Sequence, residues 1–462
     1  MIAAETALSI AARVRSGTLT AAAAVEISLA RIAEVEPKLN CFTEVYVEDA
    51  RAAAARIDAL TPGARAGMAL CGVPVAIKDF TPIAGRRTTF GSAVHADTIT
   101  TEDPVIVRRL RAAGAIIIGH TTTPEFAHSG FTHSPLWGVT RNPFDPERTP
   151  GGSSGGSAVA VATGCVPLAE GTDMGGSVRI PAALCGIVGL KPSYGRIPMD
   201  ILPTCYDQLS HFGPLARTVD DAALFLSVVE GPSDADANSL PPLPPVVPIP
   251  DLVKPRFAVS LDLGFYAPTV EVADLFEETV ARLAHAGAII ERVPIRFTTD
   301  VARDWLSLWA YAFAGDRGHL LEAHRADLDP AVVDLIEQGQ KLSAVDVRRI
   351  EHRRTALWPI LNEALAGQDA LLCPTTCMTA PRATLRDPDV EVFLPDGRYR
   401  ALDMTTPFNL LSACPALSVP MGLAADGLPA GLQIVTRRHD DRMALAAGRF
   451  VERALRGERT GA

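Results

Sequence analysis

One lysine and two serines stand in surroundings that favour chemistry over packing. Lys78 ends an apolar run, Ser153 lies in the glycine-rich run 151–157, and Ser177 lies in a second such run at 171–181. A serine hydroxyl is a weak nucleophile until a base removes its proton. Lysine is such a base only when neutral, and from its usual pKa of about 10.4 this requires a dry pocket. The apolar run before Lys78 can supply that pocket, so these residues form a candidate nucleophilic site.

Three alternatives compete with this interpretation of the first glycine-serine run. A phosphate-binding P-loop needs a lysine after Gly156, where Ser157 stands. The Gly-x-Ser-x-Gly elbow of α/β-hydrolases is met formally with Ser154 as the nucleophile, but an elbow must follow a strand. Residues 145–150 hold two prolines and favour a loop. A flexible loop would explain this run taken by itself, but it accounts for neither Lys78 nor the second glycine-rich run.

The motifs around these residues resemble those of the amidase signature family. The second run reads Gly-Thr-Asp-Met-Gly-Gly-Ser-Val-Arg-Ile-Pro. The resemblance covers most of the chain and is weakest between residues 232 and 368. It implies an α/β fold with one mixed, mainly parallel twisted sheet wrapped by helices. The runs that carry the resemblance are 72–79, 151–157, 171–181, 369–376, 408–420 and 426–433.

The resemblance also implies a role for each residue of the candidate site. Ser177 is the nucleophile that is acylated, Ser153 passes on its proton, and Lys78 is the terminal base. A cis peptide bond is implied between Gly152 and Ser153. The oxyanion hole is expected from the backbone N–H groups of Met174, Gly175, Gly176 and Ser177, which glycine lets approach closely.

Two charged residues flank the nucleophile and are expected to support it. Asp173 and Arg179 fit an ordinary surface pair, but the resemblance favours a buried ion pair that shapes the loop. Gly152 and Ser154 are expected to support the site as well. His120 and Thr122 stand where the family's pattern would place lysine and asparagine.

Two segments are candidates for the substrate pocket. His128, Ser129 and Gly130 follow a predicted strand, although hydrogen-bonded structural histidines are common. Farther along, aromatic residues on predicted helices are typical of a core and also apolar enough to line a cleft. The residues and loop in question are Trp305, Trp309, Phe313, Trp358 and 387–400.

Composition and motif spacing argue against nucleic-acid binding, a membrane span and a metal site. A net charge of −10 provides no basic surface for nucleic acid. No apolar run approaches the roughly 20 residues of a membrane-spanning helix, and residues 1–5 fit no signal peptide. Eight scattered cysteines predict reduced, buried thiols and a cytoplasmic location. Neither Cys373 with Cys377 nor any other motif gives zinc-ligand spacing, so we expect no metal and no cofactor.

The chain is predicted to form a single amidase domain over residues 1–462. Buried strands are predicted at 73–77 and 115–118, and helices at 102–113, 178–184 and 218–229, an alternation typical of α/β folds. Eight prolines between Pro232 and Pro255 mark a linker. The predicted segments are N-terminal helices 1–60, a catalytic core 65–230, the proline-rich linker 231–256, a helical region 257–368 and a C-terminal return 369–462.

The sequence therefore predicts a serine amidohydrolase that cleaves a C–N bond of a small or aryl carboxamide or anilide through an acyl-enzyme on Ser177. A carbamate (urethane) or an ester is a further candidate, because the same chemistry cleaves both. The expected partners are a small substrate and water, with the chain as a monomer or homodimer. Two alternatives stay open: the glutaminase subunit of a tRNA-dependent amidotransferase, and a catalytically inactive scaffold.

Overall fold

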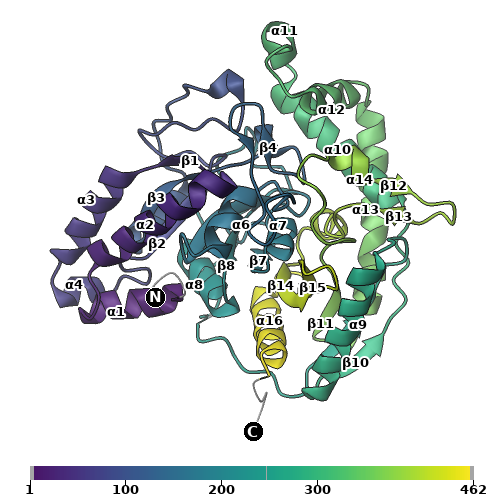
Figure 1. The fold of residues 1–462 in the computed structure, drawn as a ribbon. Coiled ribbons are helices and arrows are strands. Elements are labelled where there is room, and N and C mark those ends of the chain that lie inside the picture. Colours follow the sequence, from purple (N-terminus) through teal and green to yellow (C-terminus); the bar gives the residue numbers. More distant parts are fainter. Residues whose placement is uncertain (1–4, 246, 458–462) are drawn as a thin grey trace.

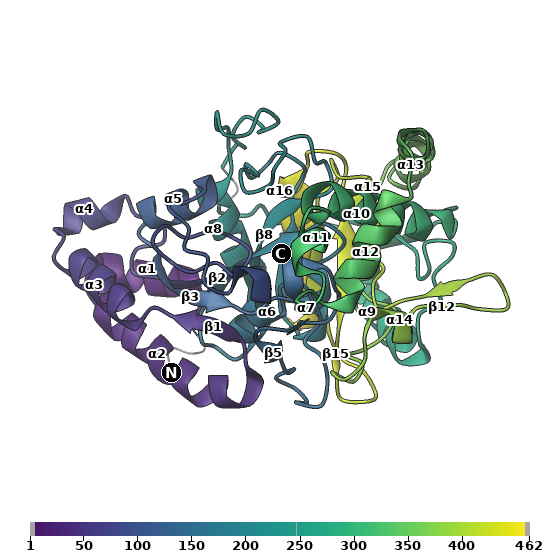
Figure 2. The same cartoon turned by 90° about the horizontal axis from the view of Figure 1, so that it is seen from above.

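One sheet of eleven strands runs across the protein, surrounded by helices (Figure 1, Figure 2). The structure, a computed structural model, describes residues 5–245 and 247–457. In spatial order the strands are β1 (Phe42–Val45), β3 (Ile116–Thr121), β2 (Pro74–Lys78), β6 (Leu168–Asp173), β8 (His211–Ala216), β7 (Val188–Lys191), β14 (Ala416–Leu423), β15 (Pro429–Val435), β11 (Ala370–Pro374), β9 (Arg256–Val259) and β10 (Ile289–Arg292).

The sheet is mixed, as predicted. Parallel pairs join β3, β2 and β6 in one region and β11, β9 and β10 in another. The pairs between these regions, from β6 through β8, β7, β14 and β15 to β11, are antiparallel. Part of this antiparallel order follows from a hairpin, because β14 and β15 are joined by a turn at Asp426 and Gly427. The parallel pairing is thus concentrated where the sequence alternates strands with helices.

Helices α1–α4 gather at one end of the molecule and α9–α14 at the other (Figure 1). Several begin at a threonine or serine cap, as for α2 at Thr20, α8 at Thr218 and α13 at Ser343. The helices are α1 (Ala7–Ser16), α2 (Ala21–Leu39), α3 (Val47–Asp58), α4 (Pro62–Ala66), α5 (Val105–Ala112), α6 (Gly155–Ala162), α7 (Arg179–Leu184), α8 (Val219–Val229), α9 (Val270–His285), α10 (Asp300–Arg317), α11 (Leu320–His324), α12 (Pro330–Gln340), α13 (Ala344–Ala364), α14 (Asp387–Val390), α15 (Pro407–Leu410) and α16 (Asp441–Leu455).

Short elements complete the fold. Two short 3₁₀ turns, η2 (Ala93–His95) and η3 (Glu125–Ala127), lie in the connections around β3. Two-residue strands form separate pairs, β4 (His133–Ser134) with β5 (Gly138–Val139) and β12 (Val392–Phe393) with β13 (Tyr399–Arg400).

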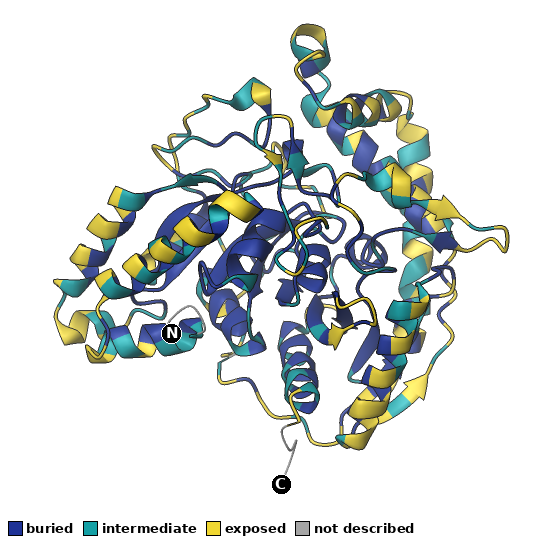
Figure 3. Cartoon of the chain, in the orientation of Figure 1, coloured by how far each residue is buried: buried dark blue, intermediate teal, exposed yellow. Residues whose placement is uncertain are grey.

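The core lies in the middle of the sheet and in two short helices beside it. Strands β2, β3 and β6 are buried at every position, and so are α6, up to its last residue, and α7 (Figure 3). Strands buried on both faces read as apolar runs without alternation, which explains the run before Lys78. Helix α6 can be this deeply buried because its glycine, serine and alanine residues let it approach the sheet closely. Helix α7 approaches the sheet through Ala182 and Ala183, which lie against Gly189 of β7 and Gly431 of β15.

The structure matches most of the predicted elements in this core. The strands predicted at 73–77 and 115–118 are β2 and β3, and the three predicted helices are α5, α7 and α8. Residues 231–245 and 247–255 of the proline-rich linker form no helix or strand, and Arg256 begins β9. Residues 1–4 of the predicted N-terminal segment, residue 246 of this linker and residues 458–462 lie outside the described residues.

Candidate active site

The structure brings Lys78 and Ser153 into direct contact. Lys78 is the last residue of β2, and its Nζ donates to Ser153 Oγ at 2.6 Å and to Thr172 Oγ1 at 2.8 Å. The lysine is fully buried and Ser153 is buried as well. Both partners of the amine are hydroxyl groups, which unlike carboxylates do not require a charged amine. Thr172 was not singled out from the sequence.

Burial determines the protonation of this lysine. Removal from water lowers the pKa of Lys78 to about 7, against the opposing charges of Glu170 and Asp173. Glu170, on β6, is fully buried too, and burial raises its pKa to about 7. The amine is therefore neutral in a substantial fraction of molecules near pH 7, which a solvent-exposed lysine is not.

Ser153 follows a cis peptide bond from Gly152, as the resemblance implied. Added to Gly152, a Cβ atom would lie 2.7 Å from the carbonyl oxygen of Ser129, so this position has room only for glycine. Gly152 and Ser153 both border the cavity described below.

Ser154 points away from that cavity. Its hydroxyl donates to the carbonyl of Thr172 at 3.3 Å, and its N–H donates to the carbonyl of Ser177 at 3.1 Å. Ser154 therefore ties the two glycine-rich loops together. This position does not suit the nucleophile of a hydrolase elbow.

Ser177 lies just before α7 and is partly exposed. It borders the same cavity as Ser153. Its carbonyl is held by the Ser154 N–H, so its loop and that of Ser153 are fixed relative to each other. The structure thus places Lys78, Ser153 and Ser177 at one site.

Carbonyl contacts orient the loop before Ser177. Trp305 Nε1 donates to the Met174 carbonyl at 2.9 Å, and Thr405 Oγ1 donates to the Gly175 carbonyl at 2.5 Å. Because a trans peptide points its C=O and N–H in opposite directions, these contacts fix the directions of the N–H groups that follow.

One of the four expected oxyanion donors is already occupied. The Gly176 N–H donates to Asp173 Oδ1 at 2.9 Å, so it does not point to a substrate oxygen. The reason is the conformation of Gly176, whose φ of +122° turns the peptide toward Asp173. Met174, Gly175 and Ser177 keep their place as candidate donors.

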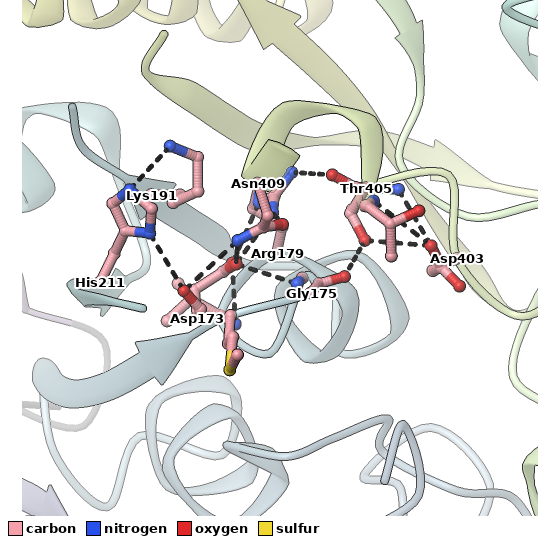
Figure 4. A network of polar contacts seen from close by, with 12 residues as sticks. Asp173, Gly175, Arg179, Lys191, His211, Asp403, Thr405 and Asn409 are labelled. Carbon is pink, nitrogen blue, oxygen red and sulfur yellow. Dashed lines mark hydrogen bonds and ion pairs between the residues drawn. The ribbon is translucent and has the colours of Figure 1, made fainter. Parts of the chain in front are cut away.

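The Asp173–Arg179 ion pair is buried and holds this loop in place (Figure 4). Arg179 donates through Nε to Asp173 Oδ2 at 3.0 Å and through Nη2 to Oδ1 at 2.8 Å. Asp173 also accepts the N–H groups of Gly176 and Val178. The pair therefore connects the end of β6 to the start of α7 across Ser177.

The C-terminal part of the chain completes the coordination of Arg179. Its guanidinium donates to Asn409 Oδ1 at 2.6 Å, to Gln433 Oε1 at 2.6 Å and to the Thr405 carbonyl at 3.1 Å. Burial acts to raise the pKa of Asp173, but the Arg179 charge and the hydrogen bonds from Arg179 and Asn409 hold it well below its usual range. Asp173 is therefore a carboxylate at all relevant pH.

A second buried lysine lies behind this network. Lys191 Nζ donates to the carbonyls of Cys414 and Pro192, and its pKa is lowered to about 7 by burial and the nearby Arg179 charge. The Nε2 atom of His211 lies 3.5 Å from Lys191 Nζ, and its Nδ1 contacts the Asp173 carbonyl (Figure 4).

A cavity of about 350 Å³ opens over Ser153 and Ser177, and Lys78 lies behind Ser153, outside the cavity wall. Its walls come from the loops of Ser153 and Ser177, from η3 and its flanks, and from α10, α12 and α14. Trp305 and Trp309 stack with ring centres 5.8 Å apart, and Phe313 packs edge-on against Trp309. The aromatic and apolar residues of the wall include Phe80, Phe126, Met174, Ile180, Trp305, Trp309, Phe313, Leu335 and Leu402.

The predicted pocket residues lie in this wall. His128, Ser129, Gly130 and Trp309 all border the cavity. His128 Nδ1 contacts the Glu125 carbonyl at 2.8 Å, and Ser129 Oγ donates to Asp387 at 2.5 Å. Trp358 does not border the cavity: it lies on α13 and packs against the core cluster beside α10.

Carboxylates form the polar part of the wall. Burial raises the pKa of Glu391 to about 7, with help from the charges of Asp387 and Asp403. Burial also raises the pKa of Asp387 and of Asp403. Asp387 and Glu391 lie in the loop 387–400 that the sequence had indicated, whereas Asp403 had not been singled out. The acidic residues of the wall, apart from Asp173, are Asp207, Asp316, Asp334, Asp387, Glu391 and Asp403.

His120 and Thr122 lie outside the site. His120 is fully buried, and burial lowers its pKa to about 4. Its Nε2 contacts the Thr81 carbonyl at 3.0 Å, and its Nδ1 contacts the Tyr46 hydroxyl at 2.7 Å and the Arg87 carbonyl at 3.0 Å. Thr122 contacts Thr140 at 2.6 Å. Across residues 5–245 and 247–457, no group of three or more histidine, cysteine, aspartate or glutamate side chains is placed to hold a metal ion.

Comparison with known proteins agrees with this geometry. The Amidase family model matches residues 23–445. The chain belongs to the amidase signature family. It is 35% identical to an acylamidase of Rhodococcus erythropolis over 95% of this chain and 93% of that protein. A solved bacterial aryl acylamidase of the same family superposes with a TM-score of 0.90 and 28% identity, covering 97% of this chain and 96% of that one.

Relatives with a different function have a similar sequence identity to this chain. The chain is 34% identical to a glutamyl-tRNA(Gln) amidotransferase subunit of Picosynechococcus sp. (strain ATCC 27264 / PCC 7002 / PR-6), over 89% of this chain and 90% of that protein. Family membership makes the chain an amidase, a hydrolase that acts on carbon–nitrogen bonds of small amides with water. Within the described part of the chain, no helix is long and apolar enough to cross a membrane.

Breaking the buried ion pair should lower stability and activity together. Asp173→Asn leaves Arg179 charged and buried, which costs about 3–5 kcal/mol. Chemical denaturation and amide turnover measure the two effects. The exposed pair Asp396 and Arg398 supplies the control, because Asp396→Asn should leave the free energy of unfolding nearly unchanged. Equal effects of the two substitutions would contradict a structural role for the buried pair.

Gly176→Ala should disturb the loop through a clash with Thr405. A Cβ atom at Gly176 would lie 2.0 Å from Thr405 Oγ1, whereas none of the described atoms lies within 4 Å at Gly397. Both glycines have positive φ, so Gly397→Ala carries the same kind of backbone strain without the clash. We expect turnover to fall at least about tenfold for Gly176→Ala only. Similar losses in both variants would assign the effect to strain.

Proposed function

We propose that the chain hydrolyses a small or aryl carboxamide or anilide through an acyl-enzyme on Ser177. The contact of Lys78 with Ser153 in a fully buried setting carries this proposal. Neutral Lys78 takes the proton of Ser153, and Ser153 takes that of Ser177 as the latter attacks the carbonyl carbon. The same path returns a proton to the departing amine.

The oxyanion of the tetrahedral intermediate would be held by the loop before Ser177. With the Gly176 N–H bound to Asp173, the proposed donors are the N–H groups of Gly175 and Ser177, with Met174 as the third candidate. The buried ion pair fixes these donors in advance, so their orientation costs little during the reaction. Water then hydrolyses the acyl-enzyme by the same proton path.

The cavity wall supports an aryl or bulky substrate. Trp305, Trp309 and Phe313 form a continuous aromatic surface beside the loop of Ser177. Burial of a ring against such a surface contributes about 2 kcal/mol or more. A carbamate or an ester of similar shape would enter the same cavity, because the proton path does not distinguish the leaving group.

The glutaminase subunit of an amidotransferase is the second candidate, on the strength of the similar relatives. The charges of the cavity favour the acylamidase. Arg317 is the one lysine or arginine side chain among the described residues that line it, and it packs over the Phe126 ring at 5.1 Å. The α-carboxylate of glutamine would thus meet a wall of mostly acidic groups. Efficient amide hydrolysis by the purified chain alone would separate the two candidates.

Ser177→Ala should abolish covalent labelling by a fluorophosphonate probe and leave the fold intact. Ser154→Ala is the matched control, because Ser154 lies in the neighbouring loop and bonds to Thr172. We expect Ser154→Ala to keep the label. Intact-mass spectrometry locates the adduct, and a label on Ser154 in the wild-type protein would favour the hydrolase-elbow mechanism instead.

The rate of acylation should fall as the pH drops through about 7. Neutral Lys78 is the active form, and its pKa of about 7 means that protonation removes the base below this value. Lys78→Ala should lower kcat/KM for an amide by about 10²–10⁴-fold and remove this dependence. A pH–rate profile of both proteins checks it. Wild-type turnover in Lys78→Ala would refute the proposed base.

Trp309→Ala should reduce the preference for aryl substrates. Loss of the stacked ring should lower kcat/KM for an anilide about 10–100-fold, and for a short aliphatic amide much less. Trp358→Ala is the control, since Trp358 lies on α13 and does not border the cavity. Kinetics on both substrates measure the ratio. An unchanged ratio in Trp309→Ala would place the specificity elsewhere in the wall.

A further inference from the structure

Glu170 is a buried carboxylate that the proposed proton path does not use. It lies in the middle of β6, on the strand next to β2, and is fully buried. A buried carboxylate is costly unless donors or charges compensate it. Its surroundings therefore indicate what it does.

Both oxygens of Glu170 accept hydrogen bonds from the segment that carries Lys78. Oε2 accepts the backbone N–H of Lys78 at 2.9 Å, and Oε1 accepts the Thr81 hydroxyl at 3.0 Å. The backbone of Glu170 is held as well, because its carbonyl accepts the Ser157 hydroxyl at 2.8 Å. The side chain thus spans two strands with both ends fixed.

This contact replaces backbone pairing at the point where the two strands separate. β2 and β6 pair at Val75 with Leu168 and at Ala76 with Ala169. Two residues later, the N–H of Lys78 meets the Glu170 side chain instead of the neighbouring backbone. The separation leaves room for Lys78 Nζ to reach Ser153 and Thr172.

Few other charges face the lysine. Asp173, at the end of β6, is paired with Arg179. Asp79 follows Lys78 and bonds to Thr89, and His120 on β3 bonds to the Thr81 carbonyl. Helix α6 presents Ser157 on this side. Among these groups, the charge of Glu170 makes the largest contribution that favours protonated Lys78.

We propose that Glu170 is a positioning residue for the base: its carboxylate anchors the backbone of Lys78 and keeps an acidic group beside the segment that carries the amine. The inference rests on the proposed role of Lys78. A negative charge nearby stabilises the protonated amine, so removing the charge extends the active range to lower pH. Loss of the anchor lowers the rate at every pH.

The pH dependence of kcat/KM for an anilide tests the proposal in the intact protein. Glu170→Gln keeps the shape but removes the charge. The Lys78 N–H and the Thr81 hydroxyl meet different oxygens of Glu170, so the glutamine NH2 group would face one of these two donors. In the wild-type protein kcat/KM should fall at low pH, and this part of the profile is called the acidic limb. In Glu170→Gln we expect the acidic limb to move to lower pH by about one unit or more, and the pH-independent value of kcat/KM to be at least several-fold lower. Glu170→Asp restores the charge, but its shorter side chain cannot reach both donors. Its acidic limb should therefore return toward the wild-type pH, while its kcat/KM stays low.

A buried glutamate elsewhere is the matched control. Glu452 lies on α16, is largely buried and has a pKa that burial raises to about 7. Glu452→Gln should leave the acidic limb in place. If Glu170→Gln fails to fold, Thr81→Val removes one donor from the carboxylate and should move the limb in the same direction by less, because that hydrogen bond favours the charged form.

Two outcomes separate this inference from the proposed function. An acidic limb that stays in place in folded Glu170→Gln or in Thr81→Val, while Lys78→Ala abolishes it, would overturn the inference alone. If Lys78→Ala keeps the acidic limb and the kcat/KM of the wild-type protein, the proposed role of the lysine itself is wrong.

Discussion

The site depends on keeping the amine of one lysine uncharged inside the protein. Burying an ammonium group without a direct counter-charge is expensive, and the amine of Lys78 contacts two hydroxyls and no carboxylate. A neutral amine avoids most of this cost. The apolar strand β2, fully buried, is what holds the group at that depth. A lysine in this state can accept a proton near neutral pH, which is what the proposed proton path through Ser153 and Ser177 requires of it.

The second requirement is a loop whose peptide groups point in fixed directions. Arg179 meets it by joining the end of β6 to segments more than 200 residues away, at Thr405 and Asn409 (Figure 4). It also donates to Gln433. The charge of Arg179 is compensated by Asp173, and its remaining donors are all satisfied by oxygen atoms. A network of this kind is strong when complete and costly when broken. It explains why the C-terminal return, which carries none of the three proposed reacting groups, is part of the site.

The sequence revealed the reacting groups more readily than their surroundings. Lys78, Ser153 and Ser177 stood out because neither an apolar strand nor a glycine loop explains them, and the structure brings them together. The burial of Asp173 with Arg179 was likewise expected. Thr172, Glu170 and Thr405 were missed, since a lone polar residue in a strand gives no periodic signal. A glutamate within the otherwise apolar stretch 166–170 was the available clue.

Other departures have local causes. Gly176 was expected to donate to the oxyanion, but its positive φ turns its N–H to Asp173. Trp358 was grouped with Trp305 and Trp309 by composition, and only the structure shows that it packs against the core beside α10 without bordering the cavity. The antiparallel middle of the sheet depends on pairings between segments far apart in the chain, such as β7 with β14.

Direct titration of Lys78 tests the central claim. The chain has only five lysines, at 38, 78, 191, 254 and 341, so NMR of protein labelled with ¹³C at the lysine ε-carbon can follow each one. The signal missing in Lys78→Met identifies the residue. The account predicts a midpoint near pH 7 for that signal. A midpoint near the ordinary lysine value of about 10.4 would contradict it, because the amine would then be protonated and unable to act as the base.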